Sequence, residues 1–325
     1  MHRRHLPPSQ SPRHSRGFRG RALRASAVGM ALLAGLTGCG IAGNVETKVD
    51  GTDKPVVLTT FTVLADMARN ISGDHVEVRS ITSPGAEIHE YEPTPDDIKQ
   101  ASQADLVLEN GMHLETWFEK FTQDAHADHV TLSEGIEPIN ITEGDGKDTA
   151  NPHAWMSPQA AMTYVDNMVK AFSRLSPEHA EDFKANAEKY RGKIREIQER
   201  MTHGLSTVPE DRRVLVTCEG AFSYLARDAG LREKYLWAVN SDGDPTPSRI
   251  AETIDEVTKN KVPAVFCEST VSDSSMRQVV DATDAKFGGT LYVDSLSDQN
   301  GPVPTYLDLL RHDAETIASA LGGHQ

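Results

Sequence analysis

SPEHAEDFKANAEKYRGKIREIQERMTHGL, residues Ser176–Leu205, is the segment around which the chain is organised. Its apolar side chains recur at steps of three or four and charged residues fill the gaps; the apolar set is Phe183, Ala187, Tyr190, Ile194, Ile197, Met201 and Leu205. This spacing is typical of one face of an α-helix. Ser176 suits the N-cap and Pro177 the first helical position, so the helix should begin there. At ~1.5 Å per residue it would extend about 45 Å, longer than a small domain is wide.

Strand and helix patterns alternate on both sides of this segment. The strand patterns are PVVLTT at 55–60, HVEVRSI at 75–81, DLVLEN at 105–110, VTL at 130–132, RVLVTC at 213–218, YLWAV at 235–239, AVFC at 264–267 and TLYVDS at 290–295. Such alternation predicts parallel sheets with crossover helices. We therefore predict an α/β fold of two lobes of parallel sheet flanked by helices and joined by one long rigid helix. The N-terminal lobe would be residues 55–175, the linker helix 176–207 and the C-terminal lobe 208–325.

The first 54 residues have a different character. Residues 1–38 contain seven arginines and no acidic residue, and they end in the 14-residue apolar run 25–38. That run is shorter than the ~20 residues that span a bilayer, so residues 1–38 are predicted to be an export signal peptide. The sequence Leu36-Thr37-Gly38-Cys39 resembles the lipobox of bacterial lipoproteins, which predicts cleavage before Cys39 and lipidation of Cys39. Residues 39–54 would be a polar tether, and the protein would be anchored at the outer face of the cytoplasmic membrane.

The charge of the chain favours cations as ligands. The whole sequence has a net charge of −15, and removal of the seven arginines of the signal leaves −22 for residues 39–325. A chain this acidic repels polyanions, which argues against nucleic acid and against anionic membrane surfaces as partners.

Potential metal ligands follow the strands, in the loops where parallel sheets bind their ligands. His89 lies in PGAEIHEYEPTPDD, His153 in NPHAWMSP, Glu219 after RVLVTC and Asp294 after TLYV. Taken singly, a loop histidine or a helix-capping acid is a commoner interpretation of each. Two imidazoles and two carboxylates together can hold a divalent cation. The sequence has no glycine-rich phosphate loop, HExxH, CxxC or Gly-x-Ser-x-Gly motif, so nucleotide binding and common hydrolytic chemistries lack their residues.

Several motifs in order give the sequence a resemblance to a known family. They are PGAEIHEYEPTPDDI, NGMHLETWFEKF, NPHAWMSP, VTCEGAFSYLARDAGL, YLWAVNSDGDPTPSRI, VFCESTVSDSSM and YVDSLS. Over nearly all of the mature chain, the sequence resembles the metal-binding lipoproteins of bacterial ABC importers, the manganese/zinc/iron solute-binding family. The resemblance implies two lobes joined by a rigid helix, with a metal ion in the cleft between them. It also implies that the ligands are His89, His153, Glu219 and Asp294.

The resemblance further suggests the cargo and the partner. A His-His-Glu-Asp set resembles the manganese and iron importers, and the loop before His153 is short, acidic and free of histidine. These features favour Mn²⁺ over Zn²⁺ or Fe²⁺ as the transported ion. The implied partner is an ABC permease, and the protein is expected to be a monomer. The alternatives are a zinc-specific binding protein and an adhesion lipoprotein with a structural metal. A metal-dependent hydrolase with Glu268 as base is disfavoured, because four protein ligands leave little room for a reacting water.

Two cysteines besides Cys39 remain to be explained. Cys218 and Cys267 each end a predicted strand and each precede a glutamate. They could be buried thiols, a disulfide between neighbouring strands, or soft metal ligands. Buried thiols are the favoured interpretation and a disulfide is the next. Direct coordination is disfavoured because neighbouring side chains of a strand point to opposite faces.

Overall fold

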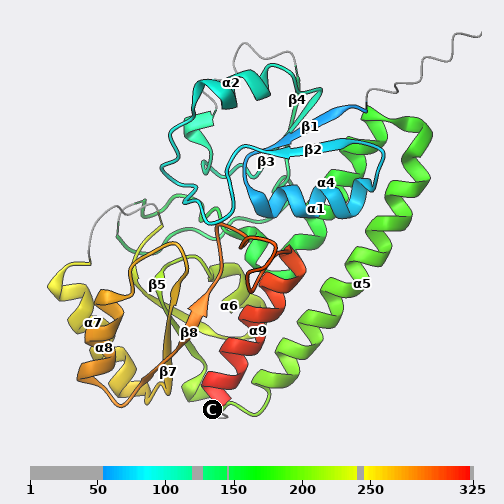
Figure 1. Ribbon diagram of the computed structural model, residues 1–325. Coiled ribbons are helices and arrows are strands. Elements are labelled where there is room, and N and C mark those ends of the chain that lie inside the picture. Colours follow the sequence, from blue (N-terminus) through cyan, green and yellow to red (C-terminus); the bar gives the residue numbers. More distant parts are fainter. Residues whose placement is uncertain (1–53, 119–126, 145, 240–244, 323–325) are drawn as a thin grey trace, which may run out of the picture. The chain divides into compact units, whose positions relative to one another are not determined.

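The computed structural model describes residues 54–118, 127–144, 146–239 and 245–322 (Figure 1). The predicted signal peptide, most of the tether and the lipidation site Cys39 lie outside these residues. Within the described ranges, no helix combines the length and the apolar character that crossing a membrane requires.

The N-terminal lobe is built on a four-stranded parallel sheet in the order β2-β1-β3-β4. Its strands are β1 (Val56–Thr59), β2 (Glu77–Ser80), β3 (Leu106–Glu109) and β4 (Asp128–Thr131). Its helices are α1 (Thr62–Ser72), α2 (Pro95–Ala101) and α4 (Pro158–Leu175), preceded by the short 3₁₀ helix η1 (Ala154–Met156). Each predicted strand is present. The motif NGMHLETWFEKF extends into residues 119–121, which are not described.

The C-terminal lobe contains two pairs of parallel strands. They are β5 (Val214–Glu219) with β6 (Arg232–Trp237), and β7 (Ala264–Glu268) with β8 (Lys286–Leu291). Its helices are η3 (Glu210–Arg212), α6 (Ser223–Ala229), α7 (Pro247–Asn260), α8 (Ser274–Ala282) and α9 (Tyr306–Gly322). Strands β5 and β7 also lie next to each other, which brings the two pairs together.

The last strand differs from its prediction. TLYVDS was expected to be the strand, but β8 begins at Lys286 and ends at Leu291. Its centre is a Gly288-Gly289 pair, which does not resemble a strand in sequence because glycine is unfavourable there. The structure gives the reason: a Cβ atom at Gly288 would lie 2.5 Å from the ring of Phe266 on β7. Glycine is therefore needed where these two strands pack.

The long helix α5 (Ala180–Leu205) packs against both lobes (Figure 1). It contacts α1 and α4 of the N-terminal lobe and α9 of the C-terminal lobe. The seven apolar residues of its predicted face are all buried, and one continuous hydrophobic core includes them together with residues of both lobes. A helix that shares its core with both lobes is suited to act as a strut.

The helical segment begins at Pro177, as predicted, but its first turn is not α-helical. The 3₁₀ helix η2 (Pro177–His179) comes first, and the α-helix begins at Ala180. The side chain of Ser176 makes no capping hydrogen bond to this helix. Instead, the N–H of Ser176 donates to Phe172 O at the end of α4, so this residue is the C-cap of the preceding helix. The tight connection between α4 and α5 leaves one residue to serve both ends.

Cys218 and Cys267 form a disulfide, with their Cα atoms 4.8 Å apart. The favoured prediction of two buried thiols is therefore wrong, although both residues are buried as expected. The physical reason is the position of β5 beside β7, which brings the two Cα atoms within the usual range of a disulfide. The order of strands in a sheet is not visible in the sequence.

Candidate metal centre

The four predicted ligands converge on one point. Nε2 of His89 lies 3.1 Å from Nε2 of His153 and 3.4 Å from Oε1 of Glu219. The same atom of His89 lies 3.7 Å from Oδ1 of Asp294. Nε2 of His153 lies 3.9 Å from Oε1 of Glu219 and 3.5 Å from Oδ1 of Asp294. None of the four side chains is more than 5% exposed.

These distances suit a divalent cation. Four ligand atoms about 2.1 Å from a central ion lie about 3.4 Å apart when they form a tetrahedron. The measured separations of 3.1–3.9 Å scatter around this value. Two imidazole nitrogens and two carboxylate oxygens form a donor set that zinc, manganese or ferrous iron can accept.

Each lobe contributes two of the four predicted ligands. His89 lies in the irregular segment before α2, and His153 is the residue before η1. Glu219 is the last residue of β5, as predicted. Asp294 was expected at the end of a strand but lies three residues beyond the end of β8. The extra residues carry the carboxylate from the sheet edge to the histidines of the other lobe.

Asn151 fixes the orientation of His153. Oδ1 of Asn151 lies 2.9 Å from Nδ1 of His153. The amide nitrogen of Asn151 donates to Gly220 O at 2.6 Å and to Ser223 Oγ at 3.2 Å, so Oδ1 must face the imidazole. The proton of His153 is thereby held on Nδ1, and the lone pair of Nε2 points into the site. This role was not predicted from the sequence, where the only signal was a polar residue two positions before His153.

Burial keeps His153 neutral. Its side chain is fully buried, and loss of hydration lowers the pKa of His153 to about 3. A neutral imidazole is the form that binds a metal ion. Trp155 packs behind this ring, with the two ring centres 5.0 Å apart, and its Nε1 donates to Val293 O at 3.1 Å.

The carboxyl group of Asp294 is buried and only partly hydrogen-bonded. Burial raises the pKa of Asp294, while His89 and a 3.4 Å hydrogen bond from Thr270 act in the opposite direction. Among the described residues, no hydrogen-bond donor reaches Oδ1 of Asp294, which faces the histidines instead. The site therefore holds a carboxylate oxygen that a cation would satisfy.

Glu268 supports Glu219 from the neighbouring strand. Its Oε2 accepts the backbone N–H of Glu219 at 3.1 Å, and burial raises the pKa of Glu268 to about 8. This geometry places Glu268 behind the backbone of a predicted ligand. From the sequence, Glu268 was considered only as the base of a hydrolase.

Hydrogen bonds between the lobes lie beside the predicted ligand Asp294. The backbone N–H of Gly85 donates to Ser295 Oγ at 2.7 Å and to Leu296 O at 3.1 Å. The N–H of Leu296 donates to Thr62 Oγ1 at 3.0 Å. Because Ser295 follows Asp294 directly, these bonds hold the segment that carries Asp294 against the N-terminal lobe.

A second group of possible ligands lies at the surface. His75, His179 and Asp182 have ligand atoms within 4.8 Å of one another. The two imidazole rings are stacked, with centres 3.8 Å apart and an angle of 20° between their planes. A metal must lie near the plane of each coordinating ring, so these stacked rings do not converge on one ion as they stand.

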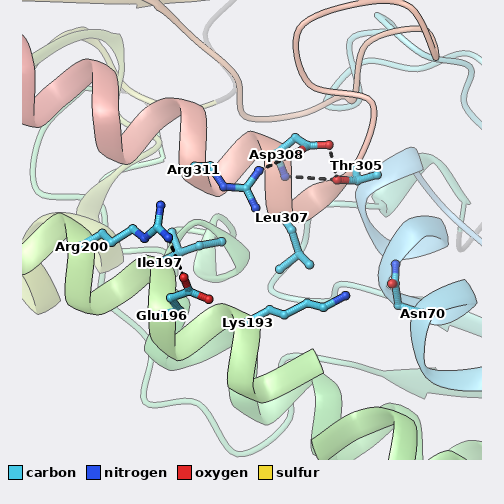
Figure 2. Close-up of a pocket in the computed structure, with 9 residues that line it drawn as sticks. All are labelled: Asn70, Lys193, Glu196, Ile197, Arg200, Thr305, Leu307, Asp308 and Arg311. Atoms are coloured by element: carbon cyan, nitrogen blue, oxygen red, sulfur yellow. Dashed lines mark hydrogen bonds and ion pairs between the residues drawn. The ribbon is translucent and has the colours of Figure 1, made fainter. Parts of the chain in front are cut away.

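A separate pocket of about 410 Å³ lies between α1, α5 and α9 (Figure 2). Lys193, Arg200 and Arg311 line it, together with Glu196 and Asp308. In Figure 2, Arg200 pairs with Glu196 and Arg311 with Asp308. None of the four predicted ligands lines this pocket, and its three cationic side chains disfavour a metal cation.

Fold and site together define a class: a two-lobed α/β protein whose buried His and carboxylate centre fits a divalent cation. Comparison with known proteins identifies the family. The family model "Zinc-uptake complex component A periplasmic" matches residues 57–320. The chain belongs to this family of metal-binding substrate-binding proteins of ABC transporters. Its members are transport proteins and not enzymes.

Relatives with different metals in their names resemble the chain. The iron-binding protein YfeA of Yersinia pestis is 48% identical over 84% of this chain and 88% of its own length. The manganese ABC transporter substrate-binding lipoprotein PsaA of Streptococcus pneumoniae is 30% identical over 90% and 96%.

Solved structures of related proteins match the fold of this chain. An Mn-bound periplasmic metal binding protein of Candidatus Liberibacter asiaticus matches with a TM-score of 0.78 and 39% identity, over 82% of this chain and all of the other. The periplasmic zinc binding protein TroA of Treponema pallidum matches with a TM-score of 0.76 and 27% identity, over 82% and 99%. The names of these relatives include iron, manganese and zinc, so family membership alone leaves the metal open.

Proposed function

We propose that this protein captures one divalent metal ion between its lobes and delivers the ion to an ABC permease, with Mn²⁺ as the preferred cargo. The ligands would be His89, His153, Glu219 and Asp294. The observation that carries the proposal is that the two buried imidazole nitrogens of the N-terminal lobe lie 3.1 Å apart and each lies 3.4–3.9 Å from one buried carboxylate oxygen of Glu219 and one of Asp294. Such a centre is costly to bury without a cation, because its carboxylates lose their hydration.

The donor set supports Mn²⁺. Both carboxylates supply hard oxygen atoms, which suit manganese better than thiolates do. The disulfide between Cys218 and Cys267 removes the thiolates that would have favoured zinc. Nearly any nitrogen and oxygen site still binds Zn²⁺ more tightly than Mn²⁺, so selection would depend on geometry and on the supply of each ion. The alternative is a zinc-specific binding protein with the same ligands.

The proposed setting is extracytoplasmic. A lipid on Cys39 would hold the protein at the outer face of the cytoplasmic membrane as a monomer, close to the permease. The shared core of α5 with both lobes limits hinge motion, so we expect modest movements when the ion enters and leaves. An adhesion role with a structural metal would instead require that removal of the metal unfolds a lobe.

Calorimetric titration tests the proposal. The full chain, purified in detergent and stripped with chelator, is titrated with Mn²⁺, with Zn²⁺ and, under anaerobic conditions, with Fe²⁺. We expect one tight Mn²⁺ site that Asp294→Ala weakens strongly, and a stripped protein that keeps its helical circular dichroism. Zn²⁺ binding without any Mn²⁺ heat or competition would reassign the cargo to zinc. Binding of none of the three ions would refute the site.

A further inference from the structure

Glu87 occupies the edge of the metal centre. It lies two residues before His89, and its two carboxylate oxygens accept the backbone N–H groups of His89 at 2.7 Å and of Glu90 at 3.0 Å. These bonds hold the carboxylate in a defined place on the loop. The side chain remains accessible to solvent, whereas the side chain of His89 is only 5% exposed.

The same carboxylate lies close to two of the predicted ligands. An oxygen of Glu87, a ring nitrogen of His89 and an oxygen of Asp294 are all within 4.8 Å of one another. His89 and Asp294 come from opposite lobes. Glu87 is therefore an accessible anionic group at the seam where the two lobes meet, next to ligands that an ion in solution cannot reach directly.

We propose that Glu87 is a receiving ligand: its carboxylate takes the hydrated divalent cation at the mouth of the site and passes it to His89 and Asp294. This inference rests on the proposed function. Hard divalent cations exchange bound waters for carboxylate oxygens, so a single anchored carboxylate can hold the ion while the buried ligands replace its remaining waters. The attraction between a doubly charged ion and one carboxylate about 5 Å away accelerates association by roughly five- to tenfold at low salt.

Stopped-flow fluorescence tests this role. The full chain in detergent is mixed with Mn²⁺, a paramagnetic quencher, and tryptophan emission is followed; Trp155 lies beside His153 and should report on filling of the site. Chelator chase then gives the dissociation rate. Glu87→Gln removes the charge, and Glu87→Asp keeps it on a shorter side chain. The matched control is Glu92→Gln, which removes one charge from an exposed position on the same loop.

We expect Glu87→Gln to slow Mn²⁺ association by roughly five- to tenfold and to flatten its dependence on salt. Mn²⁺ should associate with Glu87→Asp and with Glu92→Gln within about twofold of the wild-type rate, because both variants keep a carboxylate at position 87. Mn²⁺ should not dissociate from Glu87→Gln faster than from the wild type.

Three results would overturn the inference. Unchanged association in Glu87→Gln would show that the ion enters without this carboxylate. Equal slowing in Glu87→Gln and Glu87→Asp would show that loop geometry matters and not charge. Faster dissociation with unchanged association would make Glu87 a holding ligand. In all three cases calorimetry still finds one Mn²⁺ site in the wild type, whereas loss of that site would refute the proposed function itself.

Discussion

Two buried carboxylates, Glu115 in the N-terminal lobe and Asp294 in the C-terminal lobe, differ in what surrounds them. Glu115 accepts hydrogen bonds from Thr60 Oγ1 at 2.9 Å, from Asn110 N at 2.6 Å and from Gly111 N at 3.0 Å. Both of its oxygens are thus occupied by donors of its own lobe. Its role is to hold the turn after β3, where the backbone of residues 111–113 has positive φ angles.

Asp294 has the opposite environment. Thr270 donates to its Oδ2, while Oδ1 faces the imidazole nitrogens of His89 and His153 at 3.7 and 3.5 Å. Burial raises the pKa of both carboxyl groups, so burial does not distinguish them. The difference is in the partners: donors of the fold satisfy both oxygens of Glu115, whereas one oxygen of Asp294 is directed at two imidazole nitrogens. A buried acid of the second kind is suited to bind a cation.

The strongest test of this comparison is to neutralise each carboxylate and measure metal affinity. Asp294→Asn should raise the Mn²⁺ dissociation constant about a thousandfold, because loss of one charge from a buried ionic set costs ~4 kcal/mol. Glu115→Gln should leave the dissociation constant within about threefold, since the hydrogen-bond partners of Glu115 are Thr60, Asn110 and Gly111 and not the predicted ligands. Isothermal titration measures both.

The same pair of variants gives a control on stability. Without metal, Asp294→Asn should melt at a higher temperature than the wild type, because burial disfavours the ionised carboxylate. With saturating Mn²⁺ the wild type should melt at the higher temperature. If Glu115→Gln lost as much affinity as Asp294→Asn, the distinction drawn from hydrogen-bond partners would be wrong.

The disulfide gives the next largest effect. The disulfide links β5 to β7 covalently in the C-terminal lobe. In the N-terminal lobe, by contrast, Glu115 is held by hydrogen bonds alone. Replacing both Cys218 and Cys267 with alanine should lower the free energy of unfolding by about 2–4 kcal/mol, because the link closes a loop of 49 residues. Urea denaturation of the chelator-stripped protein measures this loss. A reducing agent should destabilise the wild type and leave the double variant unchanged; equal stability of the two proteins would mean that the link contributes nothing.

Glu115 should also make stability depend on pH. Burial raises the pKa of Glu115 from 4.5 to about 7, against the three hydrogen bonds that lower it. Between pH 4.5 and 7, the carboxyl group of Glu115 is therefore protonated in the folded state and ionised in the unfolded state. Stability from this group is present below pH 4.5 and is lost as the pH rises to 7, a change of about 2–3 kcal/mol.

Unfolding in urea at pH 5 and pH 7.5 checks the sign. Glu115→Gln should show a smaller fall in stability over this interval than the wild type. Glu92→Gln, at an exposed position, should follow the wild type. If the wild type instead gained stability relative to Glu115→Gln between pH 5 and pH 7.5, the hydrogen bonds to Glu115 would outweigh its burial.

Much of this architecture was predictable because its signals are local and repeated. The apolar face of α5 and the alternation of strands with helices need only the sequence, and the types of the four candidate ligands followed from loops after strands. The disulfide was not predictable, because it depends on β5 lying beside β7. The roles that we propose for Glu87 and Asn151 were also hidden, since a polar loop residue looks the same in sequence whether it faces solvent or a predicted ligand.

Asn151 provides the smallest and most specific test. Its Oδ1 holds the proton of His153 on Nδ1, so Asn151→Ala should release the ring and raise the Mn²⁺ dissociation constant roughly 10- to 100-fold. The matched control is Asn167→Ala. That amide is also buried, and it donates to Leu132 O and Glu134 O, away from the candidate metal ligands. Both variants should lose stability, but only Asn151→Ala should lose affinity. Equal affinity in the two variants would mean that Asn151 serves the fold alone and that His153 is oriented by its packing against Trp155.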